Sequence, residues 1–329
     1  MNQAVAVIKE IPAILNQVLA ILNTFMEMVL SVLLAFGVIS GPSTDEPITL
    51  KDAENVNLAV VALADTHIRP TGINPYNFDC GIEDIKNSGI DFDALLIAGD
   101  LSELGDDVSY ELMWDSLNKA EIENILLATG NHDIRVVYDL RTEQIIDKTN
   151  SFLGTEIDKP YYSYDIKGYT FIVMGSDKQL LEKAFISDEQ LTFIDSELER
   201  ATKDGKPAFV MCHQPLENTH GLPEVWKNGG IGEQSDKVRE ILEKYKNVFF
   251  LNGHLHDGVY ENSLEILNEE NGVYSVNLPA YGRENDYGEF LQSGLGTYFE
   301  VYDDEVVFTA RDFRAGKALE GYTMSFTLK

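Results

Sequence analysis

Short apolar runs without polar alternation restrict the fold of this chain more than any other feature. The runs occupy residues 58–64, 94–98, 125–128 and 208–212. Such runs predict strands that are covered on both faces, as in the parallel-leaning sheets of α/β proteins. Segments with helical patterns separate them, at about 76–88, 107–120, 187–203 and 234–245. This alternation of strand and helix predicts an α/β fold.

A second group of strand patterns follows in the later part of the chain. Residues 161–176 predict a hairpin that turns near Lys167 and Gly168. Further strands are expected at 273–278, 297–302, 305–311 and 322–328. Because a sheet must bury a face against another layer, we expect these late strands to form a second sheet that packs on the first.

Histidines cluster where the apolar runs end. Five of the six follow such a run, and the stretch FFLNGHLHDG at 249–258 carries two of them. The five are His67, His132, His213, His254 and His256. In open α/β sheets, ligands bind beyond the carboxyl ends of the strands. The pattern therefore predicts a single site that several loops build together.

Net charge limits the classes of partner. The 329 residues include 55 acidic and 25 basic side chains, which gives a formal net charge of −30. Broad affinity for nucleic acid requires clustered Lys and Arg, so no nucleic-acid partner is expected. The two cysteines, Cys80 and Cys212, have no CxxC spacing, and we expect no disulfide between them.

The first forty residues differ from the rest of the chain. They are mostly apolar, but polar pairs recur every seven residues, which predicts a helix with a narrow polar stripe. Three interpretations stay open: a secretory signal, a signal anchor, and an interfacial or self-associating helix. Membrane association or an extracytoplasmic location is favoured, and a cytoplasmic location is not excluded. The predicted organisation is a hydrophobic helix at 1–40, a linker at 41–56 and a folded domain at 57–329.

Five short motifs occur in order along this domain. They are Asp65-Thr66-His67, Gly99-Asp100-Leu101-Ser102-Glu103, Gly130-Asn131-His132-Asp133, His213 and Gly253-His254-Leu255-His256. Carboxylate, amide and imidazole donors without a thiolate suit borderline divalent metals such as Mn, Fe or Zn. Over about residues 57–313 the ordered set resembles the calcineurin-like metallophosphoesterase superfamily. The resemblance implies a four-layer α-β-β-α sandwich with two packed mixed sheets, which holds two divalent transition-metal ions.

The resemblance also implies a role for each motif residue. The implied ligands are Asp65, His67 and His256 for one ion, Asn131, His213 and His254 for the other, and Asp100 as the bridge between them. His132 would protonate the leaving group as a general acid. An imidazolium is usually held in place by a carboxylate, and Glu103 is the candidate partner. Asp133 is expected to brace the loop.

The implied reaction is hydrolysis of a small phosphodiester or phosphomonoester, through in-line attack by a hydroxide that bridges the metals. Arg135 and His220 are candidates for substrate contact, and each also fits an ordinary loop role. Leu104 stands where Ser/Thr protein phosphatases carry a phosphate-binding arginine, so the pattern is closer to bacterial cyclic-nucleotide and glycerophosphodiester phosphodiesterases. The net charge disfavours a nuclease. The complete set of motifs disfavours a catalytically silent metal-binding or surface-interaction protein on the same fold.

Overall fold

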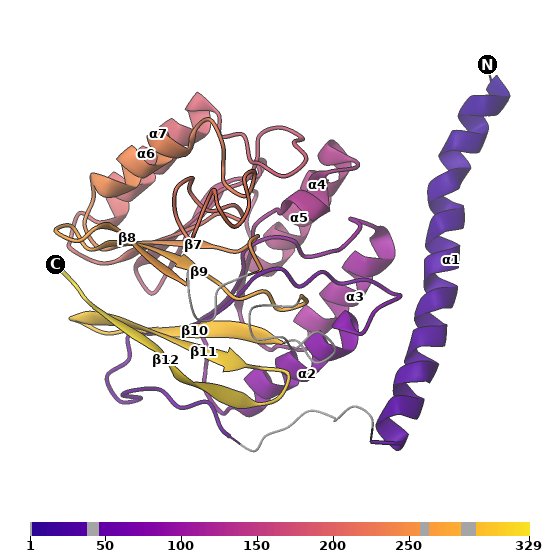
Figure 1. Cartoon of the computed structure of the whole chain (residues 1–329), viewed down its shortest axis with the longest axis horizontal. Coiled ribbons are helices and arrows are strands. Elements are labelled where there is room, and N and C mark those ends of the chain that lie inside the picture. Colours follow the sequence, from indigo (N-terminus) through magenta and orange to yellow (C-terminus); the bar gives the residue numbers. More distant parts are fainter. Residues whose placement is uncertain (1, 38–45, 257–262, 284–293) are drawn as a thin grey trace.

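Two six-stranded sheets that face each other form the centre of the fold, and helices cover their outer sides (Figure 1). The computed structural model describes residues 2–37, 46–256, 263–283 and 294–329. Within these ranges the chain has the predicted mixed α/β architecture of four layers, preceded by a long apolar helix. The fold class expected from the sequence is confirmed.

The first sheet combines the earliest strands with the last ones, in the order β12-β11-β10-β1-β2-β3. Its strands are β1 (Leu58–Leu63), β2 (Ala94–Ile97), β3 (Asn124–Leu127), β10 (Leu295–Val301), β11 (Glu305–Asp312) and β12 (Lys317–Thr327). β1, β2 and β3 are parallel, and the other pairs are antiparallel. β10 joins β1 in a register that pairs Leu58 with Val301.

The second sheet has the order β4-β5-β6-β7-β9-β8. Its strands are β4 (Tyr162–Ile166), β5 (Tyr169–Val173), β6 (Ala208–Met211), β7 (Val248–Asn252), β8 (Leu264–Asn268) and β9 (Val273–Asn277). The four central strands are parallel, and β4 and β8 pair antiparallel at the two edges. β4 and β5 form the hairpin that the sequence predicts.

Within the described residues, six helices after the N-terminal one belong to the sandwich. They are α2 (Asn74–Asn87), α3 (Asp107–Leu117), α4 (Asn131–Ile134), α5 (Tyr138–Leu153), α6 (Asp188–Ala201) and α7 (Ser235–Glu243). Apolar residues of α2, α3 and α5 share a core with the first sheet, and those of α6 and α7 share one with the second. The short α4 and the longer α5 carry no prediction from the sequence.

A third core fills the space between the two sheets and fixes how they face each other. Phe209 and Phe249 of the second sheet pack with Phe299 and Phe308 of the first, and all four are buried. The ring centres of Phe209 and Phe299, one from each sheet, are 4.7 Å apart. Burial of a phenylalanine side chain contributes roughly 1.5–3 kcal/mol, so this aromatic layer is a main source of stability.

The late strands do not form the separate second sheet that the sequence suggests. β10, β11 and β12 extend the first sheet, while β9 joins the second. β1 would otherwise leave an unpaired edge, and unpaired strand edges are unfavourable unless another segment covers them. Which edge a strand joins depends on contacts between distant segments, which the local pattern of residues does not report.

The N-terminal helix α1 (Asn2–Ala35) stands beside the sandwich and contacts α3 (Figure 1). Its polar residues Asn23, Glu27 and Ser31 line a groove of about 300 Å³ that α2 and α3 close on the other side. Large apolar residues face outward, including Ile21, which is 70% exposed. The stretch Gln17–Ala35 is long and apolar enough to cross a membrane, by length and composition.

The segment before β1 is not the free linker that its turn-rich sequence suggests. Residues 41–45 of the predicted linker lie outside the described residues, as do 38–40 at the end of the predicted N-terminal helix. From 46 onward the chain lies along the first sheet, where Ile48 is buried in the core shared with the helices. The amide of Lys51 donates to the Glu300 carboxylate at 2.7 Å, and Arg311 donates to the Glu46 carbonyl at 2.6 Å. These contacts attach the segment to β10 and β11.

Candidate metal centre

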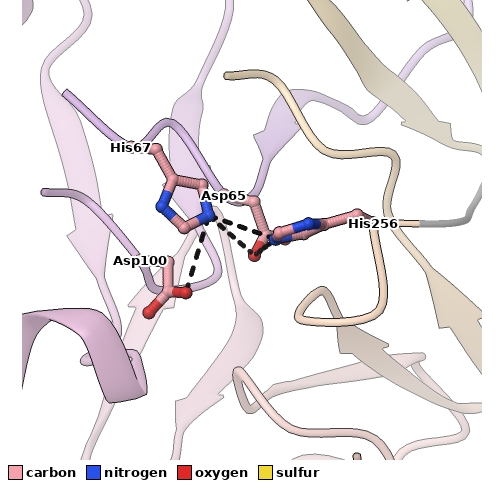
Figure 2. Close-up of side chains that lie close together, drawn as sticks. All are labelled: Asp65, His67, Asp100 and His256. Carbon is pink, nitrogen blue, oxygen red and sulfur yellow. Dashed lines mark hydrogen bonds and ion pairs between the residues drawn. The ribbon is translucent and has the colours of Figure 1, made fainter. Parts of the chain in front are cut away.

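The five motifs meet at one end of the two sheets. Asp65 and His67 follow β1, and the other motif residues follow β2, β3, β6 and β7. Figure 2 shows Asp65, His67, Asp100 and His256 with their side chains directed toward one another. Because the carboxyl ends of parallel strands meet at one edge of a sheet, residues far apart in sequence come together here.

Several candidate residues have left-handed backbone conformations. The φ angles are 54° at Asp65, 44° at His67, 50° at Asp100, 73° at His254 and 54° at His256. Non-glycine residues rarely adopt positive φ, and each instance costs of order 1–3 kcal/mol. The surrounding structure therefore holds these loops in conformations that the residues would not choose alone, and such strain is concentrated at functional sites.

Two motif glycines permit the close approach of the carboxylates. A Cβ atom at Gly130 would lie 2.1 Å from Oδ1 of Asp100, and one at Gly253 would lie 2.4 Å from Oδ2 of Asp65. In place of those Cβ atoms, main-chain amides donate to the same oxygens: His132 to Asp100 at 2.8 Å and His254 to Asp65 at 2.9 Å. Each loop thus orients an aspartate that another loop carries.

One group of side chains contains Asp65, His67, Asp100 and His256. Nε2 of His67 lies 3.1 Å from Nε2 of His256 and 3.7 Å from Oδ2 of Asp100. The side chains of Asp65 and His67 are fully buried, whereas that of His256 is 32% exposed. This group matches the ligand set that the resemblance implies for one metal ion.

A second group shares Asp100 and adds Asn131, His213 and His254. Nε2 of His213 lies 3.1 Å from Oδ1 of Asn131, 3.1 Å from Nδ1 of His254 and 3.3 Å from Oδ2 of Asp100. The other ring nitrogen of His213 donates to the Ala98 carbonyl at 2.8 Å, which turns Nε2 toward the group. All four residues are buried. The group matches the ligand set implied for the second ion.

Each charged group in the buried cluster shifts the pKa values of its neighbours. Burial raises the pKa of Asp65, but the imidazoles of His256 and His213 outweigh it and lower the pKa to about 2. Burial also raises the pKa of Asp100, but the imidazoles around it, with His213 first among them, together outweigh burial and hold that pKa well below its usual range. At His213 the attraction of Asp100 overcomes burial and raises the pKa to about 9. Burial and the charge of His213 lower the pKa of His254 to about 3.

The donor set fits a pair of divalent cations. Oδ1 of Asp65 is buried and accepts no hydrogen bond from the part of the chain that the structure describes. Around it, His256, His67 and His213 place ring nitrogens at 3.4, 3.8 and 4.0 Å. Nitrogen and oxygen lone pairs that converge on one point repel each other unless a proton or a cation lies between them. Imidazole, carboxylate and amide oxygen suit Mn, Fe or Zn.

Glu103 and His132 lie together, but the carboxylate of Glu103 is not the nearest contact of the imidazole. Nδ1 of His132 is 2.9 Å from the Glu103 main-chain carbonyl and 3.8 Å from its carboxylate. The carboxylate is closer to His67, whose Nδ1 lies 3.0 Å from Oε2. Burial raises the pKa of Glu103, but the imidazole of His67 and the charge of Arg283 lower it to about 2. The carbonyl of Glu103, rather than its carboxylate, is therefore the near contact of His132.

Asp133 braces the loops, as its position in the motif predicts. Its carboxylate accepts hydrogen bonds from the amides of Gly130, Leu101 and Ser102 at 2.9, 3.2 and 3.0 Å. The hydroxyl of Tyr110 donates to it at 3.0 Å. The loops after β2 and β3 are thus joined through one buried side chain.

The two candidates for substrate contact have different positions. Arg135 lines a cavity of about 140 Å³ together with Glu103 and His132, and its Nη2 is buried without a hydrogen bond to any described residue. His220 is fully buried, and its Nε2 lies 2.8 Å from the hydroxyl of Ser275. The structure gives His220 a place in the core beside β9, so the prediction of a substrate contact is wrong for it.

Three neighbours of the cluster could not be assigned from the motifs. Glu182 accepts a hydrogen bond from Nδ2 of Asn131 at 3.0 Å, Trp226 stacks on His254 with ring centres 4.4 Å apart, and Arg283 pairs with Glu103. None of them belongs to one of the five motifs. Their roles depend on loop packing, which carries no local sequence signal.

Comparison with known proteins agrees with the geometry. The profile of the family described as calcineurin-like phosphoesterase matches residues 58–258. A 3',5'-cyclic-nucleotide phosphodiesterase from Nostoc is 23% identical over 62% of this chain and 73% of its own length. A probable cyclic nucleotide phosphodiesterase from Synechococcus is 29% identical over 50% of this chain and 58% of its own.

Solved structures share the fold at low sequence identity. A dimetal phosphatase from Danio rerio is 12% identical, with a TM-score of 0.62 over 84% of this chain and all of that one. A purple acid phosphatase from yellow lupin seeds is 14% identical, with a TM-score of 0.57 over 82% of this chain and 53% of that one. The chain belongs to the calcineurin-like phosphoesterase family and is a metal-dependent phosphoester hydrolase.

Proposed function

We propose that this protein hydrolyses a small phosphodiester, with cyclic nucleotides as the first substrate class to test. The observation that carries the proposal is the pair of donor groups that share Asp100 at the ends of the two sheets. Relatives named as cyclic nucleotide phosphodiesterases support the choice of a diester. The net charge of −30 disfavours a nuclease, because long nucleic acids would be repelled.

The proposed ligands are those that form the two groups. They are Asp65, His67 and His256 in one group, Asn131, His213 and His254 in the other, with Asp100 in both. Two divalent ions bound there would polarise the phosphoryl group and activate a water molecule as the nucleophile. The buried carboxylates orient the imidazoles around the place of reaction and bring negative charge that attracts the cations.

His132 is the proposed general acid. Its side chain is 19% exposed, and Nε2 lies 4.0 Å from Oδ2 of the shared Asp100. A carbonyl oxygen can only accept, so Nδ1 carries the hydrogen that points at Glu103. Nε2 is then the atom that carries a transferable proton when the ring is an imidazolium, and it is the atom nearest the cluster. Arg135 is half-buried, and Nη2 of its guanidinium is proposed to donate a hydrogen bond to a substrate oxygen.

The test compares two aryl substrates with the full chain in mild detergent. Hydrolysis of bis(4-nitrophenyl) phosphate and 4-nitrophenyl phosphate is measured after loading with Mn²⁺, and 3',5'-cyclic AMP follows as the natural-type substrate. Activity that a chelator removes and Mn²⁺ restores, with preference for the diester, supports the proposal. Preference for the monoester would make the protein a phosphatase. Hydrolysis of neither, by protein that binds two metal ions, would favour the catalytically silent metal-binding protein.

We also propose that α1 attaches the hydrolase to a lipid bilayer. Its outward residues include Ile14, Ile21, Phe25 and Met28, each at least 54% exposed, and the polar stripe faces the groove beside α2. Flotation with vesicles of neutral phosphatidylcholine tests this, because the acidic chain should avoid anionic lipid. The full chain should float, and a Phe25→Glu variant should float much less. A full chain that stays at the bottom and sediments as a dimer would favour self-association instead.

A further inference from the structure

Glu103 lies between a proposed metal ligand and an arginine from a distant part of the chain. Its Oε2 atom is 3.0 Å from Nδ1 of His67 and forms an ion pair with the guanidinium of Arg283. The side chains of Glu103 and Arg283 are 17% and 26% exposed, so water competes only in part for the pair. Through this carboxylate, Arg283 is connected to the ring whose other nitrogen faces the cluster.

The main chain before Arg283 runs beside the loop that follows β1. The amides of Tyr281 and Gly282 donate to the carbonyls of Ala64 and Asp65 at 2.9 and 2.8 Å. Tyr281 is buried, and its hydroxyl is not at the rim of the site. Two consecutive hydrogen bonds of this kind fix the direction in which the next side chain leaves the backbone. Arg283 is therefore directed by the same loop that carries the first aspartate.

Asn74, at the start of α2, joins the two segments from the side. Its buried Nδ2 lies 2.9 Å from the His67 carbonyl, 2.9 Å from the Gly282 carbonyl and 3.3 Å from the Thr66 carbonyl. A Cβ atom at position 282 would lie 2.0 Å from the Thr66 carbonyl oxygen, so glycine is required for this approach. The place of Arg283 is thus built by packing.

We propose that Arg283 is a positioning residue that holds Glu103 on His67, so that His67 presents Nε2 to a metal ion. A carboxylate that contacts one ring nitrogen fixes the hydrogen there and turns the other nitrogen toward the ion. Without Arg283, Glu103 has a second imidazole to contact, because Nδ1 of His132 is 3.8 Å from Oε1. Arg283 therefore favours the contact with His67 over a turn of the carboxylate toward His132.

This inference rests on the proposed function, because it takes His67 to be a metal ligand. The experiment titrates metal-free full chain with Mn²⁺ by calorimetry and needs no substrate. Arg283→Met removes the charge and keeps most of the length of the side chain. It should weaken the binding of one of the two Mn²⁺ ions about tenfold, because loss of an outer contact of a metal ligand lowers affinity by at least that much. Glu103→Gln should weaken the same event at least as much.

Two variants make the result specific. Arg135→Met removes an arginine from the cavity beside Glu103 and His132 and should leave both Mn²⁺ affinities unchanged. In the Glu103→Gln background, Arg283→Met should have little further effect, because Arg283 acts through Glu103. Circular dichroism checks the fold. If Arg283→Met does not fold, Arg283→Gln tests the same coupling, since it keeps a polar side chain but removes the charge that pairs with Glu103.

The outcomes separate this inference from the proposed function. A wild-type chain that binds no Mn²⁺ overturns the proposed function and this inference with it. A wild-type chain that binds two ions, beside an Arg283→Met variant with unchanged affinities, overturns the inference alone. The inference would also be overturned if Arg283→Met lowered Mn²⁺ affinity equally in the wild-type and the Glu103→Gln backgrounds, because the two side chains would then act independently.

Discussion

The two halves of the candidate metal centre differ in how completely the protein encloses them. The half with Asn131, His213 and His254 is buried throughout, and the Ala98 carbonyl orients His213 from behind. The half with His67 and His256 is open at one side, where the His256 side chain is 32% exposed. An enclosed half is ordered before an ion arrives, whereas the open half lets water and substrate reach it.

The difference suggests a division of work within one site. Enclosed ligands lose little conformational freedom on binding, so we expect the ion of the buried half to bind more tightly and exchange more slowly. The open half lies next to Glu103 and His132, which line the cavity with Arg135. Substrate is therefore expected to enter on the open side.

Replacement of Asp100, which both halves share, should affect the two halves of the site equally. Asp100→Asn keeps the size of the side chain but removes a charge that both groups use. We expect it to lose both ions and to reduce turnover to the level of chelated wild-type protein. Metal content by mass spectrometry and turnover of the diester check this. Retention of two ions per chain would contradict the shared role.

Replacement of the proposed acid should reduce turnover without changing metal content. His132→Ala is expected to lower kcat by about 10²- to 10⁴-fold, the range of a positioned proton donor. The main-chain amide of His132, which holds Asp100, is retained in this variant. Diester turnover and metal content are measured on the same sample. Loss of an ion would show that His132 serves the cluster as a ligand or support.

The two histidines of the last motif should respond differently to removal. His254→Ala removes a proposed ligand and leaves a buried gap beside His213, so we expect loss of an ion and a lower melting temperature. For His256→Ala, water can reach the vacated position, so the melting temperature should change little. Metal affinity should fall by at least the roughly 10- to 100-fold that loss of an outer contact of a ligand costs. Calorimetry and thermal unfolding of the metal-free and metal-loaded forms distinguish them. Equal effects would refute the contrast between the halves.

The stability of the metal-free protein should depend on pH through His213, which belongs to the buried half of the site. His213 has a pKa of about 9 in the folded chain, above its ordinary value of 6.5. A raised pKa means that the folded state binds the proton more strongly, so its stabilisation is complete below pH 6.5 and is lost as pH rises to 9. Chemical unfolding at several pH values should show a loss of about 1–3 kcal/mol, and a His213→Asn variant should lack it. A stability that rises over this window would be inconsistent with the raised pKa.

The sequence predicts the chemistry of the site better than its contacts. The motif residues lie together as expected, because each follows a strand and strand ends share an edge. The partner of Glu103 and the burial of His220 were not predictable. Both depend on how loops from different parts of the chain pack. The carboxylate of Glu103 lies between two imidazoles, 3.0 Å from that of His67 and 3.8 Å from that of His132.

The family, the donor types and most of the strands can be predicted from the sequence, because short apolar runs and motif order are local properties. Contacts between distant segments are needed to place β10 to β12 in the first sheet, segment 46–56 along it, and Arg283 beside Glu103. The physical reason is the same in each case. These contacts join residues far apart in the chain, and their free energy depends on the shape of the packed layers rather than on neighbouring residues.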